Sequence, residues 1–561
     1  MAAVLVFIVV PLFRLCQSVS NSTSEKPNII IFMADNLSFG DVNNKSQNTP
    51  NIDRLAEQGA TFSRWYTQSS RISALASILT GLLPPRTGII KSKFLPFKEI
   101  PSLASTGGLQ SSEETLATVL KSEGYTTGFV GVWGLGVGRN GEYLPLRHGF
   151  DSFYGVPSAH REHCTGNSRT NSESYHTWRS LCSIFSPLLF ICPVVGFVVW
   201  YNGHTLNMVT VLTVVVAFVF YSSILQDGIH CTMNFIRIRS CVLYKNNKII
   251  EQPYIVENMT LRFTRSAVEF LEMASLSNKP FFLFVSFMGP KEPFFVSPLF
   301  SKSTQTLYHD ALHETDWSIG RIVKTIKDND KENSTLILVT SATGRHITES
   351  CKDCVAQKDE TPIVREKRHG SIWEQTICVP TVLNWKGRIK DRWLISTPVT
   401  VMDVMPSVLE LLNVSSAAVH TDGKSLLPVL LNTSQESQHE YIFHYVEVTK
   451  PAAVTTGPYK LIYTDTKDDG TTEIFDPPLL FNVETDPEET SPLSNDEYSE
   501  LLSNISEALM RHMQTRKNKW HSQLDSRIIP FWFPCANLHC SQTNDETNNF
   551  SDLFDLDHDD T

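Results

Sequence analysis

Long runs of basic residues are absent from the sequence. Its 48 Lys and Arg residues are outnumbered by 59 Asp and Glu residues, which gives a formal net charge of −11 at pH 7. Nucleic-acid-binding proteins gather positive charge on one face, so this balance argues against a nucleic-acid partner. Internal repeats are absent as well. The 561 residues exceed what one core usually holds, so we expect a large domain and a smaller one.

Asp, Glu, Lys and Arg are all missing between Ser180 and Gln226. One bilayer crossing takes about 20 apolar residues, so the length of this segment predicts a hairpin of two transmembrane helices, about 182–200 and 208–225. Residues 201–204 would form the turn. A hairpin returns the chain to the side that it left, so the segments before and after it can share one domain. The alternative is a buried helical hairpin in a soluble domain.

The N-terminus carries an apolar run, Val4–Phe13, that is too short to span a bilayer. This pattern predicts a secretory signal peptide over 1–20, and the alternative is a buried strand. We therefore expect a protein of the endoplasmic reticulum membrane with its bulk in the lumen, which binds membrane lipid through the hairpin. Nine Asn-x-Ser/Thr sequons agree with a lumenal chain, at Asn21, Asn36, Asn44, Asn258, Asn333, Asn413, Asn432, Asn504 and Asn549.

Cysteine is absent between Cys16 and Cys164. Eight cysteines remain outside the signal peptide and the hairpin, and in the secretory pathway disulfides are their default state. The sequence does not determine their connectivity. The Cys351-Lys-Asp-Cys354 motif favours structural pairing over a redox or metal site, because no second pair accompanies it. The eight are Cys164, Cys231, Cys241, Cys351, Cys354, Cys378, Cys535 and Cys540.

The first strand organises the predicted fold. Residues 29–32 are four consecutive β-branched or aromatic residues, between Pro27 and the Asp35-Asn36 pair, and they predict a buried parallel strand. The site of an open α/β sheet lies at the carboxyl ends of its strands, so Asp35 should project into it. A hard cation would sit there.

The rest of the chain alternates between strand and helix patterns and then becomes a region of short strands. We expect strands over 280–287, 334–343, 441–446 and 459–463, and helices over 260–275, 310–328, 400–412 and 496–519. The fold class is therefore α/β, with a smaller antiparallel sheet at the C-terminus. The predicted regions are an α/β domain over 27–179 and 229–412, the hairpin over 180–226, a small domain over 413–540 and an acidic disordered tail over 541–561.

Eight segments resemble the sulfatase family in collinear order, from about residue 27 to 535. The likeness is strongest to the branch that contains the membrane-bound steroid and aryl sulfatases, which has a paired hairpin at this place. It implies an alkaline phosphatase-like fold with a mixed central sheet, and a steroid or aryl ligand. The segments are PNIIIFMADN, TPNIDRLAEQG, ILTGLLPPRTGI, HGFDSFYG, FVSF, LVTSATG, DGKSLLPVL and DPPLLFNVETDPEE.

The family nucleophile has no counterpart in this chain. The resemblance implies a formylglycine made from the Cys of C-x-P-S-R, ten residues before the Gly of a T-G pair. Thr80-Gly81 sets the register, which places Arg71 at the Cys, Ser73 at the Pro and Leu75 at the Arg. A shifted register over 67–71 restores a hydroxyl but needs four more residues, about one helical turn.

The family metal site is also reduced. The resemblance implies calcium held by three Asp and one Asn or Gln. Asp35 is present beside Asn36, but Ala342 and Thr343 stand at the other Asp and amide positions. Affinity for calcium depends on the number of charged ligands. We therefore expect no cofactor, and calcium only if the family site is partly kept.

The groups that would hold the sulfate are replaced too. By resemblance, Val132 and Gly134 stand at the Lys and His of G-K-W-H-L-G, Lys291 replaces a His, and His369 replaces a Lys. Scaffold residues stay where chemical residues are lost. Because a buried unpaired Asp35 would be costly, we predict an internal contact between Arg71 and Asp35, with Lys291 adding positive charge.

Three hypotheses follow. The first is a catalytically inactive sulfatase relative with a binding or regulatory role, whose protein partners the sequence does not identify. The second is an active sulfuric or phosphoric ester hydrolase with atypical residues, for which Ser73 is the nearest candidate nucleophile. The third is a sterol or lipid binder that keeps an apolar pocket and the hairpin.

Overall fold

The structure of the protein is a computed structural model. The predicted signal peptide, the predicted hairpin at 180–226, the Cys351–Cys354 pair and His369 lie outside its described residues. It describes residues 26–42, 49–91, 103–157, 164, 241–252, 254, 256–292, 294–301, 306–344, 372–415, 419–431, 437–466, 471–515, 521–529, 532 and 550–554.

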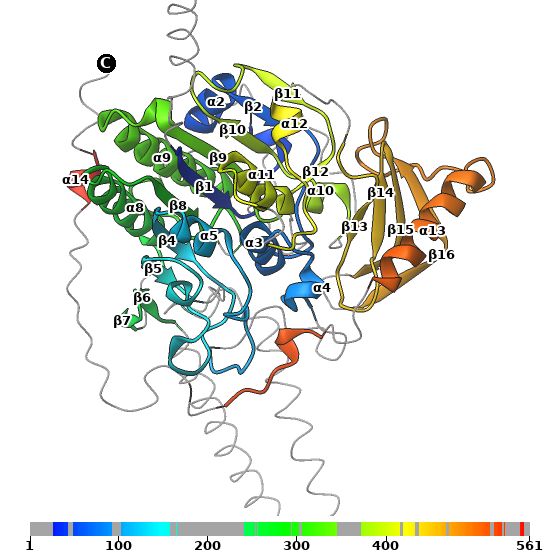
Figure 1. The fold of residues 1–561 in the computed structure, drawn as a ribbon, viewed down its shortest axis with the longest axis horizontal. Helices are drawn as coiled ribbons and strands as arrows, with labels where there is room; N and C mark the ends of the chain where they lie inside the picture. The colour runs from blue at the N-terminus through cyan, green and yellow to red at the C-terminus, as the bar shows by residue number, and fades with distance from the viewer. Residues whose placement is uncertain are drawn as a thin grey trace, which may run out of the picture.

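A ten-stranded mixed sheet lies at the centre of the larger part of the molecule (Figure 1). Its five middle strands β9, β1, β8, β4 and β5 are parallel, and antiparallel strands join them on both sides. This confirms the predicted mixed α/β sheet. The order across the sheet is β11 (Trp393–Ile395), β2 (Ala60–Phe62), β10 (Thr381–Asn384), β9 (Thr335–Ser341), β1 (Asn28–Ala34), β8 (Phe281–Ser286), β4 (Thr126–Val132), β5 (Ser152–Val156), β6 (Leu243–Lys245) and β7 (Lys248–Glu251).

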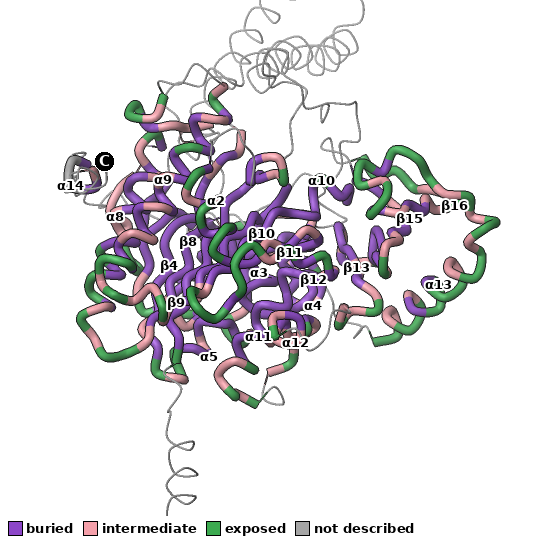
Figure 2. The backbone as a smooth tube through the Cα atoms, turned by 90° about the horizontal axis from the view of Figure 1, so that it is seen from above, coloured by how far each residue is buried: buried purple, intermediate pink, exposed green. Residues whose placement is uncertain are grey.

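Helices cover both faces of the first strand, and all seven residues of β1 are buried. Figure 2 shows that its neighbours β8 and β9 run through the same buried interior. Alternate side chains point to opposite faces of a strand. Ile29, Ile31 and Met33 pack with α3, α5 and α11, whereas Ile30 and Phe32 pack with α2, α8 and α9. The continuous apolar run of β1 therefore reflects burial on both sides. The helices around the sheet are α2 (Pro50–Glu57), α3 (Arg71–Thr80), α4 (Pro84–Thr87), α5 (Leu116–Ser122), α8 (Met259–Ser275), α9 (Leu307–Asp328), α10 (Glu374–Ile377), α11 (Val404–Leu411) and α12 (Leu427–Leu430).

The C-terminal part contains a four-stranded antiparallel sheet, as the sequence predicts. Its strands are β13 (Ile442–His444), β14 (Ala453–Thr456), β15 (Tyr459–Thr466) and β16 (Thr472–Asn482). The helix α13 (Ser499–Gln514) packs on one face through Ile505, and Trp373 packs on the other. A separate parallel pair, β3 (Trp65–Tyr66) and β12 (Val399–Thr400), lies in the larger part.

A buried ion network joins the small sheet to the segment around α10. The ammonium of Lys460 on β15 lies 3.1 Å from Glu374 Oε1 and 2.9 Å from Glu489 Oε1, and it donates to Ile372 O at 2.7 Å. Burial lowers the pKa of Lys460, but the carboxylates of Glu489 and Glu374 outweigh that effect and raise it above its usual value. The ammonium therefore stays charged inside the protein.

The longer predicted elements are confirmed. The helix expected over 260–275 is α8, the helix expected over 310–328 is α9, and the strands expected over 280–287 and 334–343 are β8 and β9. The helix expected over 400–412 begins instead as a 3₁₀ turn, η6 (Val401–Asp403), before α11. The helix expected over 496–519 has its first residue at Ser499 and its last at Gln514.

Two expectations need correction. The tail over 541–561 was expected to be disordered, but residues 550–554 include the short helix α14 (Ser551–Phe554), and Phe550 and Leu553 are buried. The acidic composition of the tail gave no indication that Phe550 and Leu553 would be buried. Pairing is also wrong for Cys378, which is buried without a disulfide beside Tyr66, Ile377 and Ile442, and its thiol donates to Ser63 O at 3.7 Å.

One disulfide joins Cys164 to Cys241, with Cα atoms 5.4 Å apart. It connects residues on either side of the segment 180–226. Among the helices that the structure describes, none combines the length and apolar character that a bilayer crossing requires.

Glu314 on α9 is a buried carboxyl group that lies outside the network of Lys460. It is 1% exposed, and its Oε2 accepts a hydrogen bond from Ser297 N–H at 3.1 Å. Burial raises the pKa of Glu314 to about 8, although the contacts with Ser297 oppose this shift. The group is therefore neutral in the folded protein at a pH where it is charged in the unfolded chain.

We expect Glu314→Gln to reduce the loss of stability between about pH 5 and pH 8. In that range the wild-type carboxyl binds a proton when folded and releases it on unfolding. The free energy of unfolding therefore falls as pH rises, by up to about 1.4 kcal/mol per pH unit. Urea unfolding at several pH values measures the slope. The exposed Glu257→Gln is the control, and equal slopes for Glu314→Gln and wild type would contradict the prediction.

Candidate functional site

The carboxyl ends of three neighbouring parallel strands bring polar residues together. Ala34 of β1 pairs with Ser341 of β9, and Met33 of β1 pairs with Ser286 of β8. Asp35 follows β1 directly. It is therefore held at this edge of the sheet, as predicted, with loops from both neighbouring strands beside it.

Backbone hydrogen bonds from both neighbours hold the turn after β1. Asp35 N–H donates to Gly289 O and Asn36 N–H donates to Thr343 O, each at 3.1 Å. Asn36 has a left-handed backbone with φ of 78°, a conformation that Asn tolerates better than most residues. Tyr308 of α9 also donates its hydroxyl to Asn36 O at 3.3 Å. The carboxylate of Asp35 is thus presented from a rigid turn.

Arg71 reaches Asp35 from the start of α3. The Ser70 side chain caps this helix by accepting a hydrogen bond from Ser73 N–H. The Arg71 Nη1 atom lies 3.0 Å from Asp35 Oδ2. Its Nη2 donates to Ser286 Oγ at 2.7 Å and to Phe287 O at 2.8 Å. The predicted internal contact between Arg71 and Asp35 is confirmed.

The carboxylate of Asp35 has two further polar neighbours. Thr343 Oγ1 donates to Asp35 Oδ1 at 2.9 Å, and Lys291 Nζ lies 3.7 Å from Asp35 Oδ2. Asp35 and Arg71 are almost fully buried, whereas the Lys291 side chain is 43% exposed. One carboxylate therefore faces two cations. Lys291 adds the positive charge that the sequence predicts, on the solvent side.

The residues at this edge do not fit a calcium site. Calcium takes six to eight oxygen ligands, with charged carboxylates supplying most of the affinity. Here the one carboxylate is bound to a guanidinium, the Thr343 hydroxyl donates to that carboxylate, and Ala342 offers only a methyl group. Asn36 is buried. Within the part of the chain that the structure describes, no group of three or more His, Cys, Asp or Glu side chains is placed to hold a metal ion.

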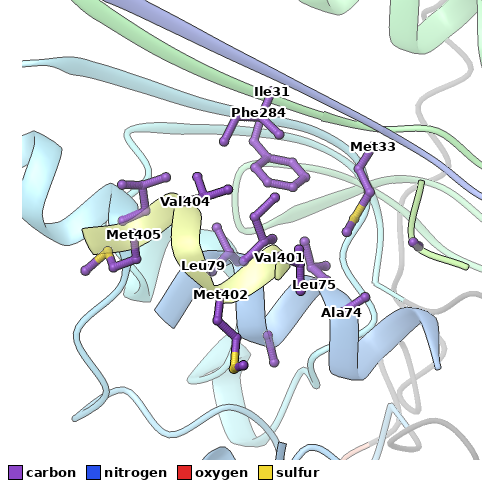
Figure 3. Packing of buried hydrophobic residues seen from close by; sticks show 14 of the residues in the cluster. Ile31, Met33, Ala74, Leu75, Leu79, Phe284, Val401, Met402, Val404 and Met405 are labelled. Carbon is purple, nitrogen blue, oxygen red and sulfur yellow. The ribbon is translucent and has the colours of Figure 1, made fainter. Parts of the chain in front are cut away.

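The other described positions carried over from the family add no polar side chain to this cluster. Leu75 lies on α3 and is buried against η6 and the sheet, and Figure 3 shows it near Val401. Val132 is buried in the core on the other face of the sheet. Gly134 has a left-handed backbone with φ of 74°, and a Cβ there would approach Ile72 to 3.0 Å. These positions supply no charge to the site, and His369 lies outside the described residues.

The two hydroxyl groups that the sequence offers as nucleophiles donate to backbone carbonyls. Ser73 is 1% exposed and donates to Ile89 O at 2.8 Å. Thr67, the first residue of the shifted register, donates to Ala342 O at 2.8 Å. A serine or threonine nucleophile needs an adjacent general base, and these two donate to amide carbonyls instead.

Sequence reasoning missed two acceptors of the Arg71 guanidinium and one donor to Asp35. Ser286 carried a signal, because it is the single polar residue at the end of the apolar run FFLFVS. The backbone carbonyl of Phe287 carried none, since any residue supplies the same group. Thr343 was assigned to a lost ligand position, but its hydroxyl stabilises the carboxylate.

The family model for sulfatases matches residues 27–414, and the model for the C-terminal region of aryl-sulfatase matches residues 437–547. The chain therefore belongs to the sulfatase family. Human steryl-sulfatase is 30% identical over 577 aligned residues, which cover 95% of each chain. Human arylsulfatase H is 29% identical, with 87% of this chain and 92% of the relative covered.

Solved structures agree on the fold. The PsFucS1 sulfatase from Pseudoalteromonas sp. superposes with a TM-score of 0.67 at 20% identity, covering 89% of this chain and 92% of that chain. At this identity the likeness concerns the fold alone. The expected sulfatase-like α/β fold with a C-terminal antiparallel sheet is confirmed.

We expect Arg71→Leu to lower the free energy of unfolding by about 3 kcal/mol, because it leaves the buried Asp35 carboxylate without its closest cation. The double variant Arg71→Leu/Asp35→Asn should lose less than the sum of the single variants, with a coupling of at least about 1.5 kcal/mol. Urea unfolding of the four proteins measures this cycle. The half-exposed Lys291→Ala should cost under about 1 kcal/mol. Additive losses would show that the pair is not coupled.

Proposed function

We propose that this chain is a membrane-anchored sulfatase-family protein that no longer hydrolyses sulfate esters and acts by binding. The observation that carries this proposal is the ion pair between Arg71 and Asp35. By resemblance, Arg71 occupies the position of the family nucleophile and Asp35 is the remaining metal carboxylate. One side chain thus replaces the nucleophile and neutralises the carboxylate that would bind the ion.

The electrostatics of the edge support binding of an anion. The formal charges of Arg71, Lys291 and Asp35 add to +1, and the exposed cation is Lys291. A sulfate or similar ester could approach that ammonium from solvent. Among the groups that the structure describes around Asp35, none is an activated nucleophile, and no set of three His, Cys, Asp or Glu side chains is placed to hold a metal ion, so a bound ester would not be cleaved.

The names of the relatives suggest the class of ligand, and the apolar segment at 180–226 suggests the location. The names steryl-sulfatase and arylsulfatase H point to steroid and aryl groups, and we extend these classes to this chain as ligands only. The segment at 180–226 would anchor the protein as a hairpin in the endoplasmic reticulum membrane, in contact with lipid. The Cys164–Cys241 disulfide supports this, because it holds the chain before and after the segment close together on one side.

An aryl sulfate assay tests the loss of catalysis. We expect the purified full chain to release no phenol above the blank, with added calcium or with a chelator. Its melting temperature should also agree within about 1 °C in the two conditions, because a ligand stabilises only a fold that binds it. Turnover would overturn the proposal. If Ser73→Ala abolished that turnover, a serine hydrolase would replace it.

Thermal shift with a steroid sulfate tests the binding role. A ligand present at about 100 times its dissociation constant stabilises a fold by about 2.7 kcal/mol. We expect a shift for wild type and for Lys248→Ala, an exposed lysine on β7, and no shift for Lys291→Ala. The same shift with the unsulfated steroid would instead favour a sterol binder that ignores the anion. No shift with either ligand would contradict the binding proposal.

A further inference from the structure

The outer surface of α8 and α9 holds a five-residue segment from the far end of the chain. Residues 550–554, which include α14, lie beside these helices in both views (Figures 1 and 2). Phe550 and Leu553 are 6% and 2% exposed. Arg321 of α9 donates to Leu553 O across 232 sequence positions. Tertiary contacts, rather than local connection, hold the segment in place.

Three apolar side chains anchor the segment. Phe550, Leu553 and Phe554 have the i, i+3, i+4 spacing that places side chains on one helical face. Leu553 N–H donates to Phe550 O at 3.0 Å and closes the turn. The Phe554 ring stacks on Trp317 of α9, with centroids 4.6 Å apart. Leu261 of α8 packs with Phe550 and Leu553 in the same apolar cluster. Both helices therefore build the surface that receives the segment.

Polar contacts set the position of the segment. The Arg265 guanidinium of α8 lies 4.6 Å from the centroid of the Phe550 ring, within cation–π range. Arg321 Nε donates to Leu553 O at 3.1 Å. The surface thus presents arginines, whereas the sequence around the segment is acidic. Its acidic residues are Asp545, Glu546, Asp552, Asp555, Asp557, Asp559 and Asp560.

We propose that this α8–α9 surface is a peptide-binding site for an acidic segment of the form Phe-x-x-Leu-Phe, filled in this chain by its own residues 550–554. A single helical turn is unstable alone, so the segment folds only where its side chains are bound. The partner that fits is a protein that exposes the same apolar spacing among acidic residues, and it competes with the internal segment.

An added peptide must compete with the internal segment 550–554 for the α8–α9 surface. A tethered ligand acts at an effective concentration in the millimolar range, so an outside peptide binds well only when the internal segment is disabled. We use the full chain with Phe550→Ala/Leu553→Ala and a fluorescent synthetic peptide of residues 547–557. Anisotropy should show saturable binding to this variant and at least about ten-fold weaker binding to wild type. Failure of the peptide to bind the variant would overturn the proposal.

Substitutions on α8 and α9 test whether the peptide binds at this surface. In the double-variant background, Trp317→Ala should abolish binding and Arg265→Ala should weaken it. Met273→Ala, an exposed position on α8, should leave it unchanged. Circular dichroism checks that each variant is folded. If Trp317→Ala is unfolded, Arg265→Ala alone tests the site. Binding that survives both substitutions would refute the site. If wild type were a dimer and the double variant a monomer, a second copy of the chain would supply the segment. That result would overturn the proposal that the segment binds within its own chain.

Discussion

A buried carboxylate needs a partner of opposite charge, and in this protein that constraint decides the chemistry of the sheet edge. Asp35 follows the central strand and cannot leave the interior, because backbone hydrogen bonds from both neighbouring loops hold it. Desolvating an unpaired carboxylate costs several kcal/mol. Arg71 supplies the charge from within the chain at 3.0 Å. The Arg71 guanidinium of the same chain therefore compensates the charge of the buried Asp35 carboxylate.

The Arg71–Asp35 pair lies at the carboxyl edge of a sheet that keeps the sulfatase fold. The guanidinium donates to Ser286 and Phe287 as well as pairing with Asp35, so it also connects α3 to the end of β8. Val132 and Leu75 are packed into apolar cores and leave no buried polar group behind. Each replacement thus fits the packing of its own place. Both sheets are kept, and the side chains at Leu75 and Val132 form part of the apolar cores that pack on the larger one.

Much of the fold was predictable because its strongest signals are local. Ile29–Phe32 predicted a strand buried on both faces, and the apolar periodicity of α8 and α9 predicted long helices. The short elements were harder. The 3₁₀ turn η6 interrupts a pattern that appears continuous in sequence, and α14 forms only because Trp317 and Leu261 receive its side chains. Cys378 stays outside a disulfide and packs with Tyr66, Ile377 and Ile442, a placement that composition does not reveal.

The sequence alone determined the family, the mixed sheet and the absence of cysteine between Cys16 and Cys164, because these depend on residue identity and on spacing along the chain. It also predicted that Arg71 would meet Asp35, since register placed both at one edge. Only the tertiary structure decided how that edge is completed. The acceptors Ser286 and Phe287, the donor Thr343 and the docked residues 550–554 come from distant segments. Their contacts depend on distances that exist only after the sheet has formed.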